Sequence, residues 1–166
     1  MDRIKKLPEK QFIQLFFLYT SSLFLIAAFL MPDRGNMLRG FWSILCSPTK
    51  LSANFFAIGG YAGTFLNMAL IGFISAWLHS LPGGGNNNPA SVLVHLLTIG
   101  FAACGLNVLN IWPNIMGVVV YGLVKKKPLG SLSNAMLFIT GLAPPSPQSC
   151  CSAIPTPRSS ASASTA

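Results

Sequence analysis

Long uncharged runs of apolar residues, separated by short polar stretches, dominate the chain. Residues 12–31 form one run of 20 without a charged side chain, and residues 55–78 form a second run of 24. Each matches the roughly 20 residues that an α-helix needs to cross the hydrocarbon core of a bilayer. The first run follows a basic start but offers no small-residue cleavage site, which favours a retained span over a signal peptide. The pattern predicts an all-α integral membrane protein with three to four spanning helices.

A third apolar run, residues 92–124, is 33 residues long, too long for one straight span and short for two. Pro113 lies beyond its middle, where a proline removes a backbone hydrogen bond and kinks or breaks a helix. We therefore predict spans at about 92–109 and 111–124, with at least one interrupted or re-entrant segment. The runs 41–51 and 132–142 are too short to cross, and we expect them to be interfacial or re-entrant.

Composition divides the chain into three parts. Residues 1–11 form a basic N-terminal segment, residues 12–143 the membrane domain, and residues 144–166 a Ser/Pro/Ala tail whose only large aliphatic residue is Ile154. A segment of that composition cannot bury a core and is expected to be disordered. It also interrupts the apolar run that begins at residue 132. Two explanations stay open: a native tail, or a frameshift that replaced the native continuation.

The charge pattern gives an orientation. The chain is 52% hydrophobic and 8% charged, with 11 Lys and Arg against 3 Asp and Glu. The basic residues cluster beside the apolar runs, as in loops that flank membrane spans, so we expect no nucleic-acid partner. Four spans with an inside N-terminus place seven basic residues inside and three outside, with the tail's Arg158 left aside. Three spans with an outside N-terminus give six and four. We expect the N-terminus and the lysine trio, residues 125–127, to face the cytoplasm.

Little in the sequence suggests catalysis. Asp2, Glu9 and Asp33 are the only carboxylates, and all lie outside the apolar runs, which excludes paired-carboxylate chemistry within the membrane. His79 and His95 flank a glycine- and asparagine-rich turn, and we expect both to lie at the interface. The four cysteines have no metal-binding spacing. We therefore expect no enzymatic activity, no cofactor and no metal.

The stretch IGGYAGTFLN, residues 58–67, contains glycines at helical spacing. A phosphate loop would need a preceding strand and a following lysine, and both are missing. Gly59, Gly63 and Asn67 fall on one helical face, and small residues at that spacing allow helices to approach closely. Asn67 lies near the middle of its span, where lipid offers no hydrogen-bond partner. It is either a bond between helices or a contact for a solute or ion.

The stretch NVLNIWPN, residues 107–114, places three asparagines and a proline inside an apolar run. If the run is a broken helix, the exposed backbone groups lie inside the protein or beside a cavity, as in transporters that bind solutes at mid-depth. The rival interpretation is a tight turn at the outer surface. Our hypothesis is that Pro113 breaks the helix and that Asn107 and Asn110 face the bundle interior with Asn67.

Residues 38–144 resemble a family of multi-pass bacterial membrane proteins, mainly from Firmicutes, catalogued as domain of unknown function 1576. The resemblance lies in SPTKLSANFFAIGGYAGTFLNMALIG, GFAACGLNVLNIWPNIMGVVVYGLV and GLAP. It implies location in the bacterial inner membrane. Members of that family are about twice as long or more and carry the unit as an internal repeat. No activity is established for them, so the resemblance supplies no catalytic residues. The departure after GLAP favours a truncated or frame-shifted copy.

These patterns lead to two functional hypotheses. The first is a component of a transporter or channel for a small solute or ion, with Asn67, Asn107 and Asn110 as polar contacts. The second is a structural or accessory membrane subunit whose asparagines only bind helices together. A membrane enzyme comes third. The expected partners are the lipid bilayer and either a second copy of the chain or a missing second repeat.

Overall fold

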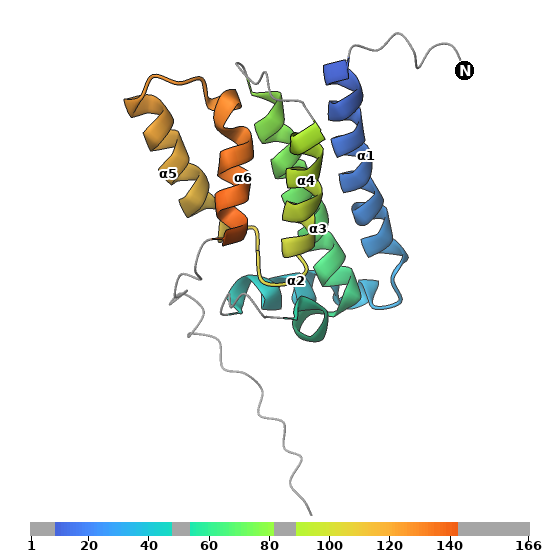
Figure 1. The fold of residues 1–166 in the computed structure, drawn as a ribbon. Helices are drawn as coiled ribbons and strands as arrows, with labels where there is room; N and C mark the ends of the chain where they lie inside the picture. Colours follow the sequence, from blue (N-terminus) through green and yellow to red (C-terminus); the bar gives the residue numbers. More distant parts are fainter. Residues whose placement is uncertain (1–8, 48–53, 82–88, 143–166) are drawn as a thin grey trace, which may run out of the picture.

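The computed structural model describes residues 9–47, 54–81 and 89–142, which form helices and connecting turns (Figure 1). No strand occurs among these residues, so the expected all-α fold is confirmed. The predicted Ser/Pro/Ala tail lies outside the described ranges. In chain order the elements are α1 (Glu9–Leu30), the 3-10 helix η2 (Arg34–Asn36), α2 (Met37–Cys46), α3 (Phe55–Ser80), α4 (Pro89–Phe101), α5 (Ile111–Val124), the 3-10 helix η3 (Leu129–Leu132) and α6 (Ser133–Leu142).

Helices α1 and α3 form an antiparallel pair and are the two longest elements (Figure 1). Both are long and apolar enough to cross a membrane, by length and composition. At 26 residues, α3 extends over about 39 Å. The two helices touch at Gly72, where an added Cβ would lie 2.5 Å from Ser21 Oγ. The apolar runs at 12–31 and 55–78 thus correspond to real helices.

Helix α3 is kinked near its start rather than straight. Gly60 has φ +70° and ψ 179°, a conformation that a residue with a Cβ rarely adopts. The carboxylate of Asp33, which follows α1, accepts a hydrogen bond from the backbone N of Ala62 at 3.1 Å. The main part of α3 therefore begins with an anion at its N-terminus, where the helix dipole favours negative charge.

Helix α2 packs crosswise against the first turns of α3, through glycines on both helices (Figure 1). An added Cβ at Gly63 would lie 2.8 Å from the carbonyl carbon of Gly40, and one at Gly59 would lie 2.7 Å from the Gly40 oxygen. The GG-x-x-G stretch thus provides close helix packing, and the helix that it contacts is α2. The expected interfacial segment 41–51 begins earlier, at Met37, and its helix ends at Cys46.

The apolar run 92–124 forms two short helices with an irregular stretch between them. Helix α4 ends at Phe101, eight residues before the predicted end of the span 92–109. Helix α5 begins at Ile111, as predicted. The break occupies residues 102–110, which we name the α4–α5 turn. Pro113 is the third residue of α5, in the first turn, where a missing N–H costs no intrahelical bond. Pro113 therefore starts a helix and does not break one.

Helix α6 completes the bundle beside α4 and antiparallel to α5 (Figure 1). Met136 and Leu137 from α6 are buried in the same apolar cluster as Ile99 from α4 and Ile115 from α5. The run 132–142, predicted to be interfacial or re-entrant, thus contributes side chains to the apolar core. It provides one wall of the bundle.

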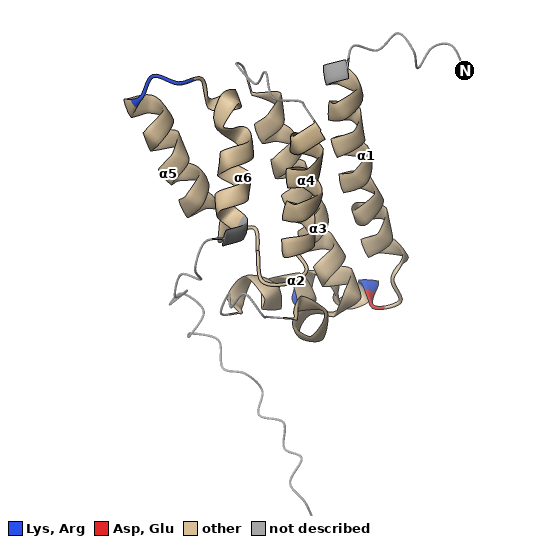
Figure 2. Cartoon of the chain, in the orientation of Figure 1, with Lys and Arg blue, Asp and Glu red and all other residues tan. Residues whose placement is uncertain are grey.

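Charged side chains lie at the two ends of the bundle (Figure 2). Asp33, Arg34 and Arg39 lie at the end where α2 crosses, and Lys125–Lys127 lie at the opposite end, between α5 and η3. Residues 11–32, 40–47, 54–81 and 89–124 contain no Lys, Arg, Asp or Glu. The helices therefore enclose an uncharged body between two charged ends.

The close approach of α2 and α3 predicts the effect of a methyl group at Gly63. We expect Gly63→Ala to lower the free energy of unfolding by about 1–3 kcal/mol, because the clash is with backbone that cannot rotate away. Gly100→Ala is the matched control, since nothing lies within 4 Å of an added Cβ there. It should stabilise the helix by up to about 1 kcal/mol. Thermal unfolding in detergent measures both, and equal stability of the two variants would contradict the packing.

Candidate functional site

The α4–α5 turn exposes backbone groups that a continuous helix would satisfy. Gly105, with φ +132°, turns the chain after α4, and the N–H of Leu106 bonds back to the carbonyl of Phe101 at 3.0 Å. This is the 6→1 bond of a Schellman motif, with glycine at the residue that leaves the helix. Two carbonyls of this segment, those of Ala102 and Leu106, still need donors from outside the turn.

Asn67 supplies those donors from the middle of α3. Its side chain is fully buried, and its Nδ2 donates to the carbonyl oxygens of Ala102 at 2.8 Å and Leu106 at 2.9 Å. Both amide protons are therefore used to hold the C-terminal end of α4. The carbonyls of Ala102 and Leu106 are thus both paired, although they are directed toward the interior.

Asn107 holds the other end of the same turn. Its Oδ1 accepts from the backbone N of Asn110 at 2.8 Å, just before α5 begins. Its Nδ2 donates over 3.4 Å to the carbonyl of Ile44 in α2. The backbone N of Phe55 also donates to the carbonyl of Ala103 at 3.3 Å, which ties the start of α3 to the turn. Hydrogen bonds therefore tie the turn to both α2 and α3.

The predicted site residues are close in the fold but are not arranged as we expected. Asn67, Asn107 and Asn110 are all buried. Asn67 and Asn107 bind different ends of the turn instead of each other, because Asn67 Nδ2 donates to two carbonyls and Asn107 is bonded to Ile44 and Asn110. Whether these asparagines contact a solute or ion stays a prediction.

One acceptor in this region has no protein partner. Asn67 Oδ1 is the single buried side-chain nitrogen or oxygen, in the described part of the chain, that makes no hydrogen bond. A buried, unsatisfied carbonyl oxygen costs about 1–3 kcal/mol. A flipped amide would not remove the cost, because it would place an oxygen against two carbonyl oxygens. Asn67 Oδ1 is thus a predicted contact atom that receives no hydrogen bond from the protein and can accept one from a ligand.

A second polar cluster, which the sequence analysis missed, lies nearer to the lysine-bearing end. We name it the histidine cluster: Thr20, Ser75, His79, His95 and Asn134, contributed by α1, α3, α4 and α6. His95 is fully buried and His79 is 3% exposed, so both lie inside the bundle, whereas their expected depth at the membrane interface stays a prediction. They are buried because α6 covers His79, while α1 and α3 enclose His95.

Two hydroxyls contact the ring nitrogens of His95. Thr20 Oγ1 lies 3.0 Å from Nε2, and the carbonyls of Phe16 and Phe17 are alternative acceptors for its single proton. Ser75 Oγ lies 2.8 Å from Nδ1. In a neutral ring one nitrogen donates to its hydroxyl and the other accepts from its own. The ring of Phe17 stacks on it, with centroids 4.3 Å apart.

His79 has a different pair of partners. Its Nδ1 lies 2.9 Å from the carbonyl of Ser75, which can only accept, so Nδ1 carries a proton. Its Nε2 lies 2.9 Å from Asn134 Oδ1. Either Nε2 is also protonated and the ring is a cation, or the Asn134 amide is turned by 180° and donates to a neutral ring. Ser75 thus contacts one histidine with its hydroxyl and the other with its carbonyl.

The sequence carried a signal for this cluster. Ser75 and His79 are four residues apart, hence on one face of a helix, and both lie in a span with few other polar residues. The partners Thr20, His95 and Asn134 lie 75, 20 and 55 residues away from their contacts, and no local pattern joins them. No group of three His, Cys, Asp or Glu side chains that could hold a metal occurs in the described ranges.

The paired amide of Asn67 predicts a specific loss of stability. Asn67→Leu keeps a similar volume but leaves the carbonyls of Ala102 and Leu106 without donors, so we expect a loss of about 1–3 kcal/mol. Asn114→Leu is the matched control, because its half-buried amide makes one long bond, 3.4 Å, within its own helix. Hydrogen exchange should also rise in residues 102–110 of the first variant. An Asn67→Leu protein as stable as the control would rule out the capping role.

Comparison with known proteins identifies a family. No curated protein and no solved structure matches the chain. Residues 33–161 match the family described as "Protein of unknown function (DUF1576)". The match includes α2–α6, and hence Ser75, His79, His95 and Asn134, whereas α1 with Thr20 precedes it. It also extends past Ala143, so the similarity does not end where the composition changes. The chain belongs to the DUF1576 family.

Proposed function

We propose that the chain is an integral membrane protein whose uncharged body lies within the bilayer. The supporting observation is the separation of charge: an uncharged body lies between Asp33, Arg34 and Arg39 at one end and the lysine trio at the other (Figure 2). Large apolar side chains are also exposed on that body, among them Leu15, Ile26 and Leu123. In water such a surface would promote association, whereas lipid covers it at no cost.

The charge pattern also supports an orientation in a bacterial inner membrane. The start of α1 and the lysine trio lie at the same end of the bundle (Figure 1). Basic residues favour the cytoplasmic side. We propose that this end faces the cytoplasm. Helix α2, which contains Arg39 and follows Arg34, then lies at the outer side of the membrane.

Single cysteines test this orientation in a background without the native cysteines. We expect Lys6→Cys and Lys126→Cys to react with an impermeant thiol reagent only after the cells are permeabilised. Arg34→Cys, at the opposite end, should react in intact cells. Labelling of Lys126→Cys in intact cells would reverse the proposed orientation, and release of the protein by an alkaline wash would contradict insertion.

We propose further that the protein is a component of a transport system for protons or small polar solutes, with the histidine cluster as its polar site. The cluster carries this proposal because ionisable side chains inside a membrane are costly and by default mark a functional site. It begins at His79 and Asn134 near the lysine-bearing end and continues through Ser75 and His95 to Thr20, near the middle of α1. Its hydrogen bonds thus lead from one end toward the centre of the body.

Between the level of Ser75 and that of Asn67, Ile71 of α3 and Ile99 of α4 are buried. The hydroxyls of Ser21 and Thr98, also buried here, donate to carbonyls of their own helices. This layer separates the histidine cluster from Asn67 Oδ1, the acceptor without a protein partner. A complete path would need this layer to open or a second unit to supply a second wall. Transport sites commonly lie between two repeats, so we propose that a second copy or a second repeat completes it.

A second candidate function has its own support. The asparagines of the α4–α5 turn bind helices together, which is the behaviour expected of a structural or accessory subunit. In that case the histidine cluster would also serve only to join α1, α3, α4 and α6. The two functions differ in whether Ser75 is needed for activity or only for stability.

Proton flux into liposomes separates these functions. Protein fractions of known oligomeric state are reconstituted with an entrapped pH dye, and flux is driven by a potassium diffusion potential. We expect flux from the oligomeric fraction and none from the monomer. Ser75→Ala should reduce it at least tenfold, because it removes the hydroxyl that contacts His95. Ser80→Ala is the matched control, since that exposed hydroxyl bonds only to the carbonyl of Trp77.

The outcomes are distinct. Flux that is equal in the two serine variants would remove the histidine cluster from the path. No flux from any wild-type fraction, together with a loss of stability in Ser75→Ala, would favour the structural subunit. Flux from the monomer would show that no second unit is needed.

A further inference from the structure

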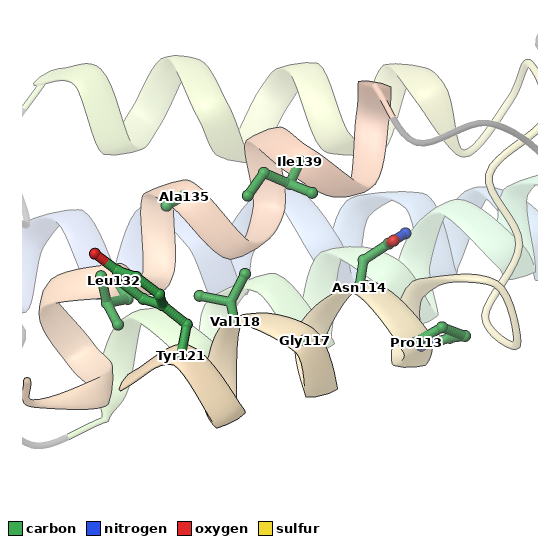
Figure 3. A pocket seen from close by; sticks show the side chains of 8 residues that line it. All are labelled: Pro113, Asn114, Gly117, Val118, Tyr121, Leu132, Ala135 and Ile139. Atoms are coloured by element: carbon green, nitrogen blue, oxygen red, sulfur yellow. The ribbon is translucent and has the colours of Figure 1, made fainter. Parts of the chain in front are cut away.

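An apolar groove runs between α5 and α6 (Figure 3). It encloses about 490 Å³ and is lined by Pro113, Gly117 and Tyr121 on one side and by Leu132, Ala135 and Ile139 on the other. The groove is open because Gly117 has no side chain and Ala135 has only a methyl group. Nothing lies within 4 Å of a Cβ added at Gly117. The groove is separate from both polar sites described above.

One end of the groove leads toward the lysine trio. Tyr121 and Leu132 lie at one end and Pro113 at the other (Figure 3). Four residues after Tyr121, the chain reaches Lys125, Lys126 and Lys127, all exposed. Asp33 is the one acidic residue whose side chain the structure describes, and it lies at the opposite end of the bundle. The groove is therefore mainly apolar, with Asn114 as the one amide in its lining, and positively charged residues lie beyond its end.

Lys126 adopts a backbone conformation that does not suit a lysine. Its φ is +52°, and it occupies the residue just beyond the C-terminal cap of α5. The N–H of Lys127 bonds to the carbonyl of Gly122 at 2.9 Å and that of Lys126 to Leu123 at 3.3 Å, which together form a Schellman motif. Glycine or asparagine is usual at this left-handed residue, because a Cβ is strained there.

Since glycine would avoid this strain, the presence of lysine at residue 126 needs an explanation. A positive charge near a helix C-terminus complements the helix dipole, and basic loops set topology. Lys125 and Lys127 already provide both effects without left-handed strain. Strained residues that persist are concentrated at functional sites, which points to a use for the charge of Lys126 itself.

We propose that the α5–α6 groove and the lysine trio bind one anionic phospholipid. The acyl chain lies along the groove, the ring of Tyr121 lies near the glycerol level, and the phosphate lies beside Lys125–Lys127. This inference rests on the membrane insertion proposed above. An anionic headgroup is favoured because each basic residue near the surface strengthens its binding.

Charge also argues against a second copy in the groove. Two copies inserted with the orientation proposed above are related by an axis along the membrane normal, so both lysine trios would lie at the same end. Facing each other across the grooves, six lysines would repel. A lipid with a negative phosphate fits the same surface without that repulsion.

The test uses detergent-purified protein and two probes, dioleoyl phosphatidylglycerol and dioleoyl phosphatidylcholine. Native mass spectrometry counts the lipid molecules retained, and thermal unfolding measures stabilisation. We expect one tightly held phosphatidylglycerol, bound about a hundredfold more tightly than phosphatidylcholine, because three lysines contribute. Equal retention of the two lipids would overturn the proposal.

Two variants separate the groove from the charge. Gly117→Leu fills the groove without a backbone clash and should abolish retention, whereas Gly100→Leu, on α4 and equally unobstructed, should leave it unchanged. Lys126→Gly should raise stability in the absence of lipid and weaken phosphatidylglycerol retention about fivefold. Full retention by Gly117→Leu would overturn the groove as the site.

Two other results are distinguishable. If Gly117→Leu changes the oligomeric state and not lipid retention, the groove belongs to a second copy and the proposal fails. If an alkaline wash releases the wild-type protein from membranes, the proposed membrane function fails, whatever the lipid titration gives.

Discussion

The requirement that backbone polar groups find partners in an apolar interior governs this fold at the α4–α5 turn. The chain leaves the helical conformation between Phe101 and Ile111, and the buried carbonyls of this stretch need hydrogen-bond donors. One side chain, Asn67, donates to both Ala102 and Leu106. Asn107 completes the arrangement by joining the start of α5 to α2. The asparagines in NVLNIWPN and their partner at residue 67 are thus explained by the break that they stabilise.

The rest of the bundle is arranged around that turn. Helix α2 can reach Asn107 only because Gly40, Gly59 and Gly63 let it lie directly against α3. Asp33 then caps the kinked start of α3 on the same side. With the turn closed by α2, the polar groups of the other half gather separately, around Ser75 and the two histidines. The protein therefore has two buried polar regions, one that holds a helix break and one that contains ionisable rings.

Periodicity and length predicted the all-α fold, the two long helices, the start of α5 and a break before Pro113. The end of α4 was misplaced because Gly105 and the Asn67 amide, not the proline, determine where that helix stops. Proline resembles a breaker in sequence, yet in the first turn of a helix it is well tolerated. For the histidine cluster, the spacing of Ser75 and His79 was the available local signal, but the partners that α1, α4 and α6 contribute depend on packing that no local pattern reveals. Asn67 was singled out because of its depth, although its partners depend on the tertiary fold.

The Asn67 side chain is expected to cap the C-terminal end of α4, and NMR signals of its amide group can report this directly. Protein labelled with ¹⁵N at asparagine and with ¹³C at the carbonyl carbons of alanine and leucine can be reconstituted in lipid for solid-state NMR. The account predicts that the Asn67 side-chain nitrogen is dipolar-coupled to the carbonyl carbons of both Ala102 and Leu106, and that its protons exchange with water only slowly. A folded protein in which this amide exchanges rapidly and couples to neither carbonyl would contradict it.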